Sequence, residues 1–289
     1  MSHSTSRFFP LFCALVTFGL VFGLGACGDS ETGKVRVHMA DAPFPFGLLD
    51  SAAVAIDGVE VHVASGPGDD SGFETISTEE DTVNLLDLQN GVTRILGEAE
   101  VPVGSINQVR LLVVDAWVVL TDGRNFPLEI PSGDRSGIKI HVEPPIEVQG
   151  GLTSELLLDF DVSRSFHPTP ASPINASDIV GFVFRSSVRA VNLSEAGSVS
   201  GRVNDDLGTP DTDDDVPIEG ATVTAYLGNE ELTTTATDED GDFVLIGLPA
   251  GEIMITADST GFIENAIDVT VVAGNLLADN IIRLHRTAP

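Results

Sequence analysis

The stretch "VRLLVVDAWVVL" (residues 109–120) decides the fold class, because its apolar residues occupy both faces of an extended strand. A strand of this kind belongs at the centre of a sheet. Nearby, "KVRVHM" (34–39) alternates apolar and charged residues with a period of two, the pattern of a strand with one buried face. Gly-rich turns such as "QGG" (149–151) separate such stretches, and helical periodicity is nearly absent. The sequence therefore predicts an all-β protein made of β-sandwiches.

Two local irregularities are expected within these strands. In "VAIDGVEVHV" (54–63) the apolar residues change parity midway, which predicts a β-bulge at Asp57-Gly58. Asp115 interrupts the apolar run at 109–120. It is either buried and paired with Arg110 or Arg189, because a buried unpaired carboxylate is costly, or exposed by a second bulge or a strand end.

A domain boundary is expected near Glu195. Before it, "VNLLDLQNGVTRILGEAE" (83–100) is the one segment in which a helical turn is expected. After it, seven strand candidates follow within 197–289 and predict a compact second sandwich. The short connection "NLSEAG" (192–197) predicts that the two domains touch or flex only a little.

The charge of the chain limits its partners. The formal net charge is −30, which argues against nucleic acid, because binding to phosphates requires Lys and Arg. Hydrophobic residues make up 42% of the chain, so the composition is that of a folded body and not of a disordered acidic tail.

The amino-terminal segment has the pattern of a secretory signal. Arg7 precedes "FFPLFCALVTFGLVFGLGA" (8–26), which is almost free of polar residues. A transmembrane anchor is the alternative, but three glycines weaken its far end and no basic cluster follows. The residues "LGAC" (24–27) resemble the lipobox of bacterial lipoproteins. That resemblance implies cleavage after residue 26 and acylation of Cys27, with residues 27–33 as a lipidated linker.

The same resemblance bears on location and on cysteine chemistry. Gly28, where an Asp would retain a lipoprotein at the inner membrane, favours an anchor in the outer membrane of the cell envelope. Removal of Cys13 with the signal and acylation of Cys27 would leave no thiol for a disulfide, a metal site or a nucleophile.

Two further family resemblances cover the rest of the chain. "GSVSGRV", "PIEGATV", "TTATDEDGDF" and "LPAGEI" resemble the carboxypeptidase regulatory-like domain, which implies an Ig-like or transthyretin-like sandwich over about 197–285. Six blocks between 34 and 193, among them "NLLDLQNG" (84–91) and "FRSSVRAVN" (184–192), resemble the lipoprotein family known as domain of unknown function 4382. Residues 194–196 are the expected linker. Neither resemblance implies an enzymatic activity.

Calcium binding is the most specific hypothesis for a site. The loop at 204–217 is rich in Asp, and the turn at 237–243 is expected at the same end of the second sandwich. Carboxylates spaced at i, i+2 and i+4 are typical of calcium loops, although the Gly and Glu of an EF-hand loop are missing. The alternative is a solvated acidic loop beside a hairpin turn. The residues of the calcium hypothesis are Asp211, Asp213, Asp215, Asp238, Asp240 and Asp242.

Three other kinds of site have weaker support in the sequence. A zinc site would need three histidines expected on outer strand faces, namely His38, His62 and His141. A hydrolase would use Asp161 and His167, but a catalytic triad is recognised by geometry, and sequence neighbours on a strand point to alternate faces. A carbohydrate site would use Tyr226 or Trp117, of which Trp117 is expected in the core.

The sequence thus predicts a non-enzymatic lipoprotein of the cell envelope that acts as a surface binding, adhesion or structural module. Its expected partners are the membrane, through the lipid anchor, and an envelope protein or glycan. A carbohydrate-binding accessory lipoprotein is the first alternative and an uncharacterised hydrolase the second. Apart from a calcium ion, no cofactor is expected.

Overall fold

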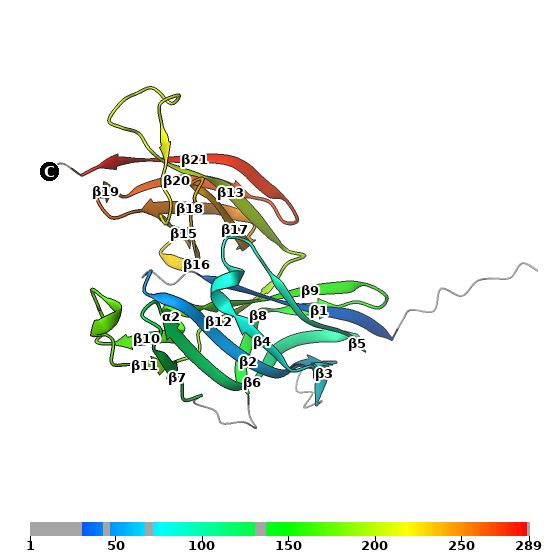
Figure 1. Cartoon of the computed structure of the whole chain (residues 1–289). Helices are drawn as coiled ribbons and strands as arrows, with labels where there is room; N and C mark the ends of the chain where they lie inside the picture. Colours follow the sequence, from blue (N-terminus) through cyan, green and yellow to red (C-terminus); the bar gives the residue numbers. More distant parts are fainter. Residues whose placement is uncertain (1–30, 43–46, 67–71, 131–136, 288–289) are drawn as a thin grey trace, which may run out of the picture.

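A computed structural model describes residues 31–42, 47–66, 72–130 and 137–287 of the chain. It shows two β-sandwiches in series, the second lying against one face of the first (Figure 1). The predicted all-β class with two sandwich domains is confirmed. The signal segment 1–26 and Cys27 lie outside the described residues.

The first domain consists of two packed sheets and a small strand pair. The four-stranded sheet has the order β12 (Val188–Asn192), β9 (Thr153–Asp161), β1 (Thr32–Ala42), β5 (Arg94–Pro102). The six-stranded sheet has the order β3 (Phe73–Ser77), β2 (Leu49–Ala64), β6 (Gly104–Leu120), β7 (Asn125–Pro127), with β4 (Asp81–Asn84) also on β2 and β8 (Ile138–Val148) also on β6. The remaining elements are β10 (Phe166–Thr169), β11 (Gly181–Phe184), the single-turn helices η1 (Leu85–Leu88) and η2 (Ala176–Asp178), and the four-residue helix α2 (Val162–Ser165).

Strand β6 is central, as its apolar composition predicts, because it pairs with β2 on one side and with β7 and β8 on the other. Its core-facing residues change parity after Val113: Ala55 of β2 pairs with Asp115, whereas Ile56 pairs with Val113. The extra residue, Val114, forms a bulge. Part of the two-sided apolar pattern at 109–120 therefore comes from this change of parity.

The bulge also settles the position of Asp115, whose side chain is exposed. The pairing with Arg110 or Arg189 does not occur, since Arg110 binds Glu60 and Arg189 binds Asp159. The predicted bulge at Asp57-Gly58 is confirmed by a register shift between Ile56 and Gly58.

The core of the first domain contains a cluster of packed aromatic rings at one end. Phe160, Phe166 and Phe184 are buried, and the ring centroids of Phe166 and Phe184 lie 5.2 Å apart. Trp117 is not part of this core: it is half-buried on the outer face of the six-stranded sheet, so its predicted core position is wrong.

The second domain also has two sheets. One has the order β14 (Val216–Pro217), β13 (Ala196–Asp205), β21 (Leu276–Arg286), β19 (Phe262–Ile263), with β17 (Asp242–Pro249) on the other side of β13. The other has the order β16 (Glu230–Ala236), β15 (Thr222–Leu227), β18 (Gly251–Asp258), β20 (Asn265–Val271). The seven predicted strands all form, and the short β14 and β19 are additional.

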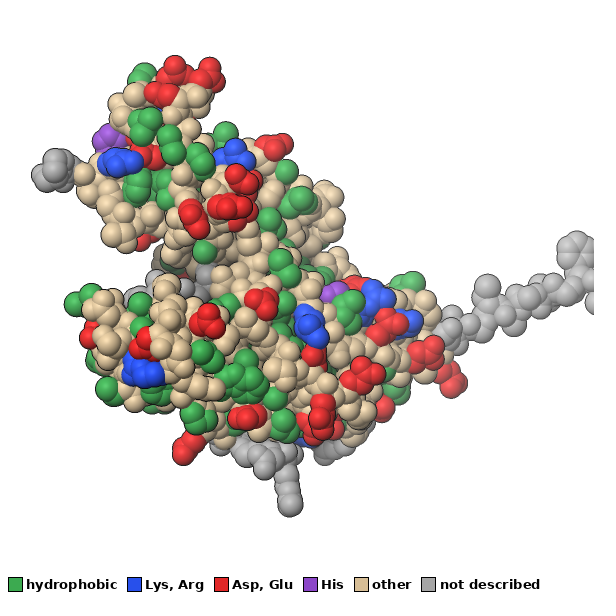
Figure 2. Space-filling view, in the orientation of Figure 1, with side chains coloured by type: hydrophobic (Ala, Val, Ile, Leu, Met, Phe, Trp, Pro, Cys, Tyr) green, Lys and Arg blue, Asp and Glu red, His purple; other side chains and the backbone are tan. Residues whose placement is uncertain are grey.

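Acidic side chains are spread over the visible face of both domains and gather at the tip of the second (Figure 2). Within the described ranges, no helix has the length and apolar character required to cross a membrane.

Candidate functional site: the contact between the two domains

The outer face of the four-stranded sheet provides the first half of the contact. Along β9, Leu156, Leu158 and Phe160 point into the first core, so Leu157 and Asp159 lie on the opposite face. Leu157 is nevertheless fully buried, because the second domain covers it. A Cβ placed on Gly247 of β17 would lie 3.1 Å from Leu157 Cδ2, which shows how closely the two domains pack.

Two arginines cross the contact. Arg189 of β12 donates to Asp159 Oδ2 at 2.9 Å and to the Gly247 carbonyl oxygen of the second domain at 3.2 Å. Arg164 of α2 pairs with Glu231 of β16 at 2.9 Å. Because Asp159 is buried, its pairing with Arg189 also satisfies a charge that would otherwise be costly at the contact.

Asn90 closes the free edge of β17. Its Oδ1 accepts a hydrogen bond from the Val244 N–H at 2.5 Å, and its Nδ2 donates to the Asp242 carbonyl oxygen at 3.3 Å. The side chain thus imitates the pairing of a neighbouring strand. An unpaired edge strand invites association with other chains, so this contact protects the edge.

The adjacent Gly91 is required by the same contact. Its φ is +78°, a conformation that glycine adopts readily, and a Cβ there would lie 2.7 Å from Val244 Cγ1. Asn90 itself has a φ of 54°, and Asn tolerates this left-handed region better than most residues. The Asn-Gly pair therefore allows the loop after η1 to approach β17 closely.

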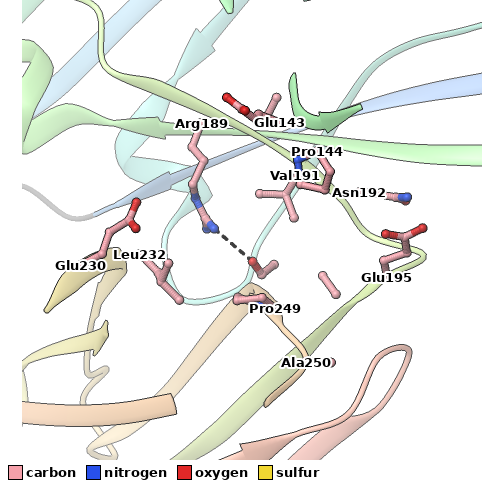
Figure 3. Close-up of a pocket in the computed structure, with 13 residues that line it drawn as sticks. Glu143, Pro144, Arg189, Val191, Asn192, Glu195, Glu230, Leu232, Pro249 and Ala250 are labelled. Atoms are coloured by element: carbon pink, nitrogen blue, oxygen red, sulfur yellow. Dashed lines mark hydrogen bonds between the residues drawn. The ribbon is translucent and has the colours of Figure 1, made fainter. Parts of the chain in front are cut away.

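A cleft of about 410 Å³ lies beside the contact (Figure 3). Its walls come from both domains and are largely apolar, with Val191 and Pro144 on one side and Leu232 and Pro249 on the other. Its size lies within the range of small-ligand pockets, about 300–1,000 Å³, and such pockets often occur between domains.

The charged groups of the cleft differ in whether they have binding partners. Arg189 also lines the cleft, and its guanidinium is engaged by Asp159 and the Gly247 carbonyl oxygen. Three exposed glutamates face the opening, and in the described part of the chain none of them forms an ion pair: Glu143, Glu195 and Glu230. The cleft therefore combines apolar walls with an acidic rim.

Family models match both halves of the chain. Residues 32–175 match a domain of unknown function, DUF4382, and residues 198–283 match the carboxypeptidase regulatory-like domain. The chain joins a DUF4382 domain to a carboxypeptidase regulatory-like domain. Asn90 lies within the matched residues 32–175, whereas Arg189 lies beyond them, in the segment that leads to the regulatory-like domain.

Solved structures that match the chain do so at low identity and low TM-score. The Bacillus anthracis TIE protein is 15% identical over 89% of this chain, with a TM-score of 0.26, and this chain spans 34% of its length. The minor pilin GBS52 of Streptococcus agalactiae is 9% identical, with 88% and 97% of the two chains covered and a TM-score of 0.27. The major pilin BcpA of Bacillus cereus is 10% identical, with 89% and 71% covered and a TM-score of 0.25. No curated protein matches the chain.

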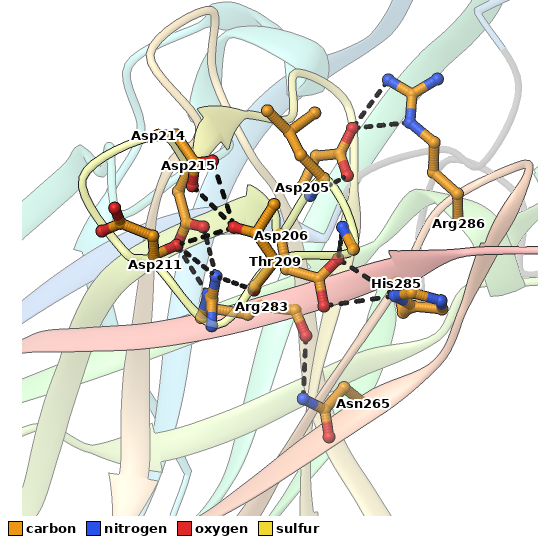
Figure 4. A network of polar contacts seen from close by, with 12 residues as sticks. Asp205, Asp206, Thr209, Asp211, Asp214, Asp215, Asn265, Arg283, His285 and Arg286 are labelled. Atoms are coloured by element: carbon orange, nitrogen blue, oxygen red, sulfur yellow. Dashed lines mark hydrogen bonds and ion pairs between the residues drawn. The ribbon is translucent and has the colours of Figure 1, made fainter.

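The acidic loop of the regulatory-like domain is organised around an arginine (Figure 4). Arg283 of β21 donates to both carboxylate oxygens of Asp215, at 2.7 and 2.6 Å, and to the carbonyl oxygens of Thr209 and Asp211, at 3.1 and 2.9 Å. A guanidinium therefore binds the carboxylate of Asp215, one of the six residues of the calcium hypothesis.

The turn after β16 lies at the same end of the domain, as the strand directions predict, because Arg202 of β13 pairs with Asp242. Asp238 Oδ1 accepts hydrogen bonds from the backbone N–H groups of Asp240 and Asp242, and Asp242 pairs with Arg202 at 2.7 Å. Among the described residues no group of three or more carboxylate, His or Cys side chains is placed to hold a metal ion. Calcium binding by these loops stays a prediction, and it would require the loops to rearrange.

The other predicted site residues are not brought together. Asp161 caps α2 by accepting from the Arg164 N–H at 2.9 Å, whereas His167 is exposed on β10, so the described structure shows no hydrolase arrangement of the two. The three histidines lie on different strands, β1, β2 and β8, and His38 binds Glu155 at 2.5 Å. Tyr226 is half-buried, and its pKa is raised, chiefly by burial.

Sequence reasoning missed the residues of the domain contact. One signal was present: in "LLLDF" (156–160) a leucine, Leu157, lies on the face opposite the core-facing residues. An apolar residue on the outer face of such a strand indicates a further covering layer, here the regulatory-like domain.

Proposed function

We propose that the chain is a lipoprotein of the cell envelope, anchored in the outer membrane through Cys27, and that its two sandwiches act together as a non-enzymatic surface module for binding or adhesion. The observation that carries this proposal is the domain contact. Leu157, Asn90 and Arg189 fasten the regulatory-like domain to the DUF4382 domain through apolar packing and through bonds to the backbone of β17.

A fastened pair of domains favours a module with a fixed shape. Strand β1 begins at Thr32, five residues after Cys27, so an anchor there would hold the DUF4382 domain close to the membrane. The acidic surface keeps such a module soluble and separate from its neighbours. The interdomain cleft is the place where a ligand would contact both domains at once.

The anchor is tested by mass spectrometry of the native protein and by fractionation. The expected result is a mature chain that begins at an acylated Cys27, and the C27A variant should leave the membrane fraction. An unmodified Cys27 in a chain that retains residues 1–26 would overturn the anchor.

The binding role is tested by crosslinking in intact cells with photoreactive groups placed at the cleft, for example at Leu232. A group at Leu227, which is exposed at the end of β15 and outside the cleft, is the matched control. A specific envelope partner or glycan captured from Leu232 and not from Leu227 is the expected result. Equal capture from both positions would remove the cleft as the binding site.

A further inference from the structure

A second, much smaller cavity lies inside the domain contact. Its volume is about 10 Å³, roughly the space of one water molecule. The DUF4382 domain contributes Asp41 and Asp159 to its lining, and the regulatory-like domain contributes Thr235 and Val244.

Two of these residues carry buried oxygens that lack a hydrogen-bond partner. Asp41 is 6% exposed, and its Oδ1 accepts from the Val162 N–H at 3.1 Å, but its Oδ2 accepts no hydrogen bond from any described residue. The Gln89 side chain is near enough to the carboxyl group to lower its pKa, although it does not satisfy Oδ2. Thr235 is 2% exposed, and its Oγ1 is likewise unpartnered. Buried polar atoms of this kind are uncommon and call for an explanation.

The charged groups around Asp41 do not neutralise it. Asp159 on β9 is paired with Arg189, and Asp161, at the start of α2, is paired with Arg164, which also reaches Glu231 of β16. The stretches of β16 and β17 that line the cavity, 233–235 and 244–246, carry no ionisable side chain. An ionised Asp41 would therefore be a buried carboxylate without a cation of its own.

We propose that Asp41 is a proton-binding site that couples the domain contact to pH: the carboxyl group is neutral while the domains are in contact, and loss of its proton loosens the contact. A neutral carboxyl has an O–H donor, and the unpartnered Thr235 hydroxyl oxygen can accept it, directly or through one water molecule. Opening the contact gives an ionised Asp41 access to solvent.

The electrostatics agree with this assignment. Burial raises the pKa of Asp41 well above its ordinary value; the charges of Asp159 and Asp161 act in the same direction, and the Val162 N–H and Gln89 oppose them. Because the pKa is raised in the closed form, the closed form holds its proton at pH values at which the open form has lost it. The contact is therefore strongest near and below the ordinary Asp pKa and weakens as the pH rises toward the raised value.

The Val244 amide reports directly on the contact, because it donates to Asn90 across the two domains. In hydrogen exchange of the full chain, its protection factor should fall with rising pH, up to tenfold per pH unit between the two pKa values. D41N mimics the neutral acid, so its protection factor should stay constant over the same range. D115N, which changes an exposed carboxylate of the same domain, should follow the wild type.

Two results would overturn the proposal. One is a D41N profile with the same pH dependence as the wild type. The other comes from the wild-type protein alone and does not depend on how the variants fold: carbon NMR titration of Asp side chains should show one carboxyl with a midpoint far above the rest. The assigned Asp41 signal titrating in the ordinary range would exclude a proton held at the contact.

Discussion

The pKa of an aspartate carboxyl group is shifted in opposite directions at the domain contact and at the acidic end of the regulatory-like domain. At the contact, the pKa of Asp41 is raised, first of all by burial. At the acidic end, the pKa of Asp242 is lowered by the hydrogen bond from Arg202, and that of Asp206 by the Gly208 N–H, with a smaller contribution from His285. Both regions lie on sandwich strands or the loops beside them, so the fold alone does not set the direction.

Access to solvent and to a cation makes the difference. The Arg202–Asp242 pair is nearly half exposed, so water and the guanidinium both stabilise the ionised form. Asp41 has lost most of its water, and the nearby arginines are already paired with other carboxylates. A protein rich in carboxylates can therefore hold a proton on one buried carboxyl group and pair another, exposed carboxylate with an arginine.

The strongest test of this comparison removes the apolar packing of the contact. L157A should lower the free energy of unfolding by about 3 kcal/mol, because a fully buried leucine leaves a cavity. Urea unfolding measures the loss. L152A, at an exposed leucine of the same sheet region, should change it by less than about 0.5 kcal/mol. Equal effects of the two substitutions would show that the contact adds no stability.

A smaller loss of stability is expected when the Asn90 side chain no longer hydrogen-bonds to the edge of β17. N90A leaves the Val244 N–H and the Asp242 carbonyl oxygen without their partner and should cost about 1–2 kcal/mol. Thermal unfolding gives the shift, and N275A, whose side chain makes no hydrogen bond in the described structure, is the matched control. No difference between the two variants would contradict the role of Asn90.

The acidic loop is tested by its arginine. R283Q removes the guanidinium that binds Asp215, so the loop oxygens become free for a cation. About 1 mM Ca²⁺, the range of weak extracellular sites, should raise the melting temperature of R283Q more than that of the wild type. R94Q, which removes the arginine of an ion pair in the first domain, controls for the loss of one positive charge. No rise of the melting temperature with calcium in any of the three proteins would remove the calcium hypothesis.

The smallest expected effect concerns the melting temperature at acidic pH. The lowered pKa of Asp242 means that its ion pair stabilises the fold above the ordinary Asp pKa and is lost as the pH falls through the lowered value. D242N should therefore flatten the decline of the melting temperature below about pH 4, and added salt should shrink the difference. D268N, whose carboxylate forms no ion pair in the described structure, should keep the wild-type profile. A wild-type profile in D242N would exclude this contribution.

Much of the architecture was predictable because strand periodicity is a local property. The alternation in 34–39, the parity change at Asp57-Gly58 and the seven strands of the second domain all follow from residues that are neighbours in sequence. Trp117 was misplaced because the sequence left a second bulge near Asp115 as one of two alternatives; that bulge forms at Val114, shifts the parity of β6 and turns Trp117 outward.

The candidate site was hidden because its parts are distant in the chain. Asn90 and Val244 are separated by 154 positions, and nothing local to either residue predicts their hydrogen bond. Arg283 likewise enters the loop at 206–215 from the last strand, and nothing local to the loop predicts that a guanidinium binds Asp215 there.

The sequence by itself determined that this chain is a pair of β-sandwiches with an acidic surface. The alternation of apolar and polar residues, the turn residues and the net charge are all properties of the sequence alone. Only the tertiary structure decided which faces of the two sandwiches meet, which carboxylates receive an arginine and which one is left without. The physical reason is that burial and charge pairing depend on distances in space, and a strand pattern fixes the faces of a strand without fixing what comes to lie against them.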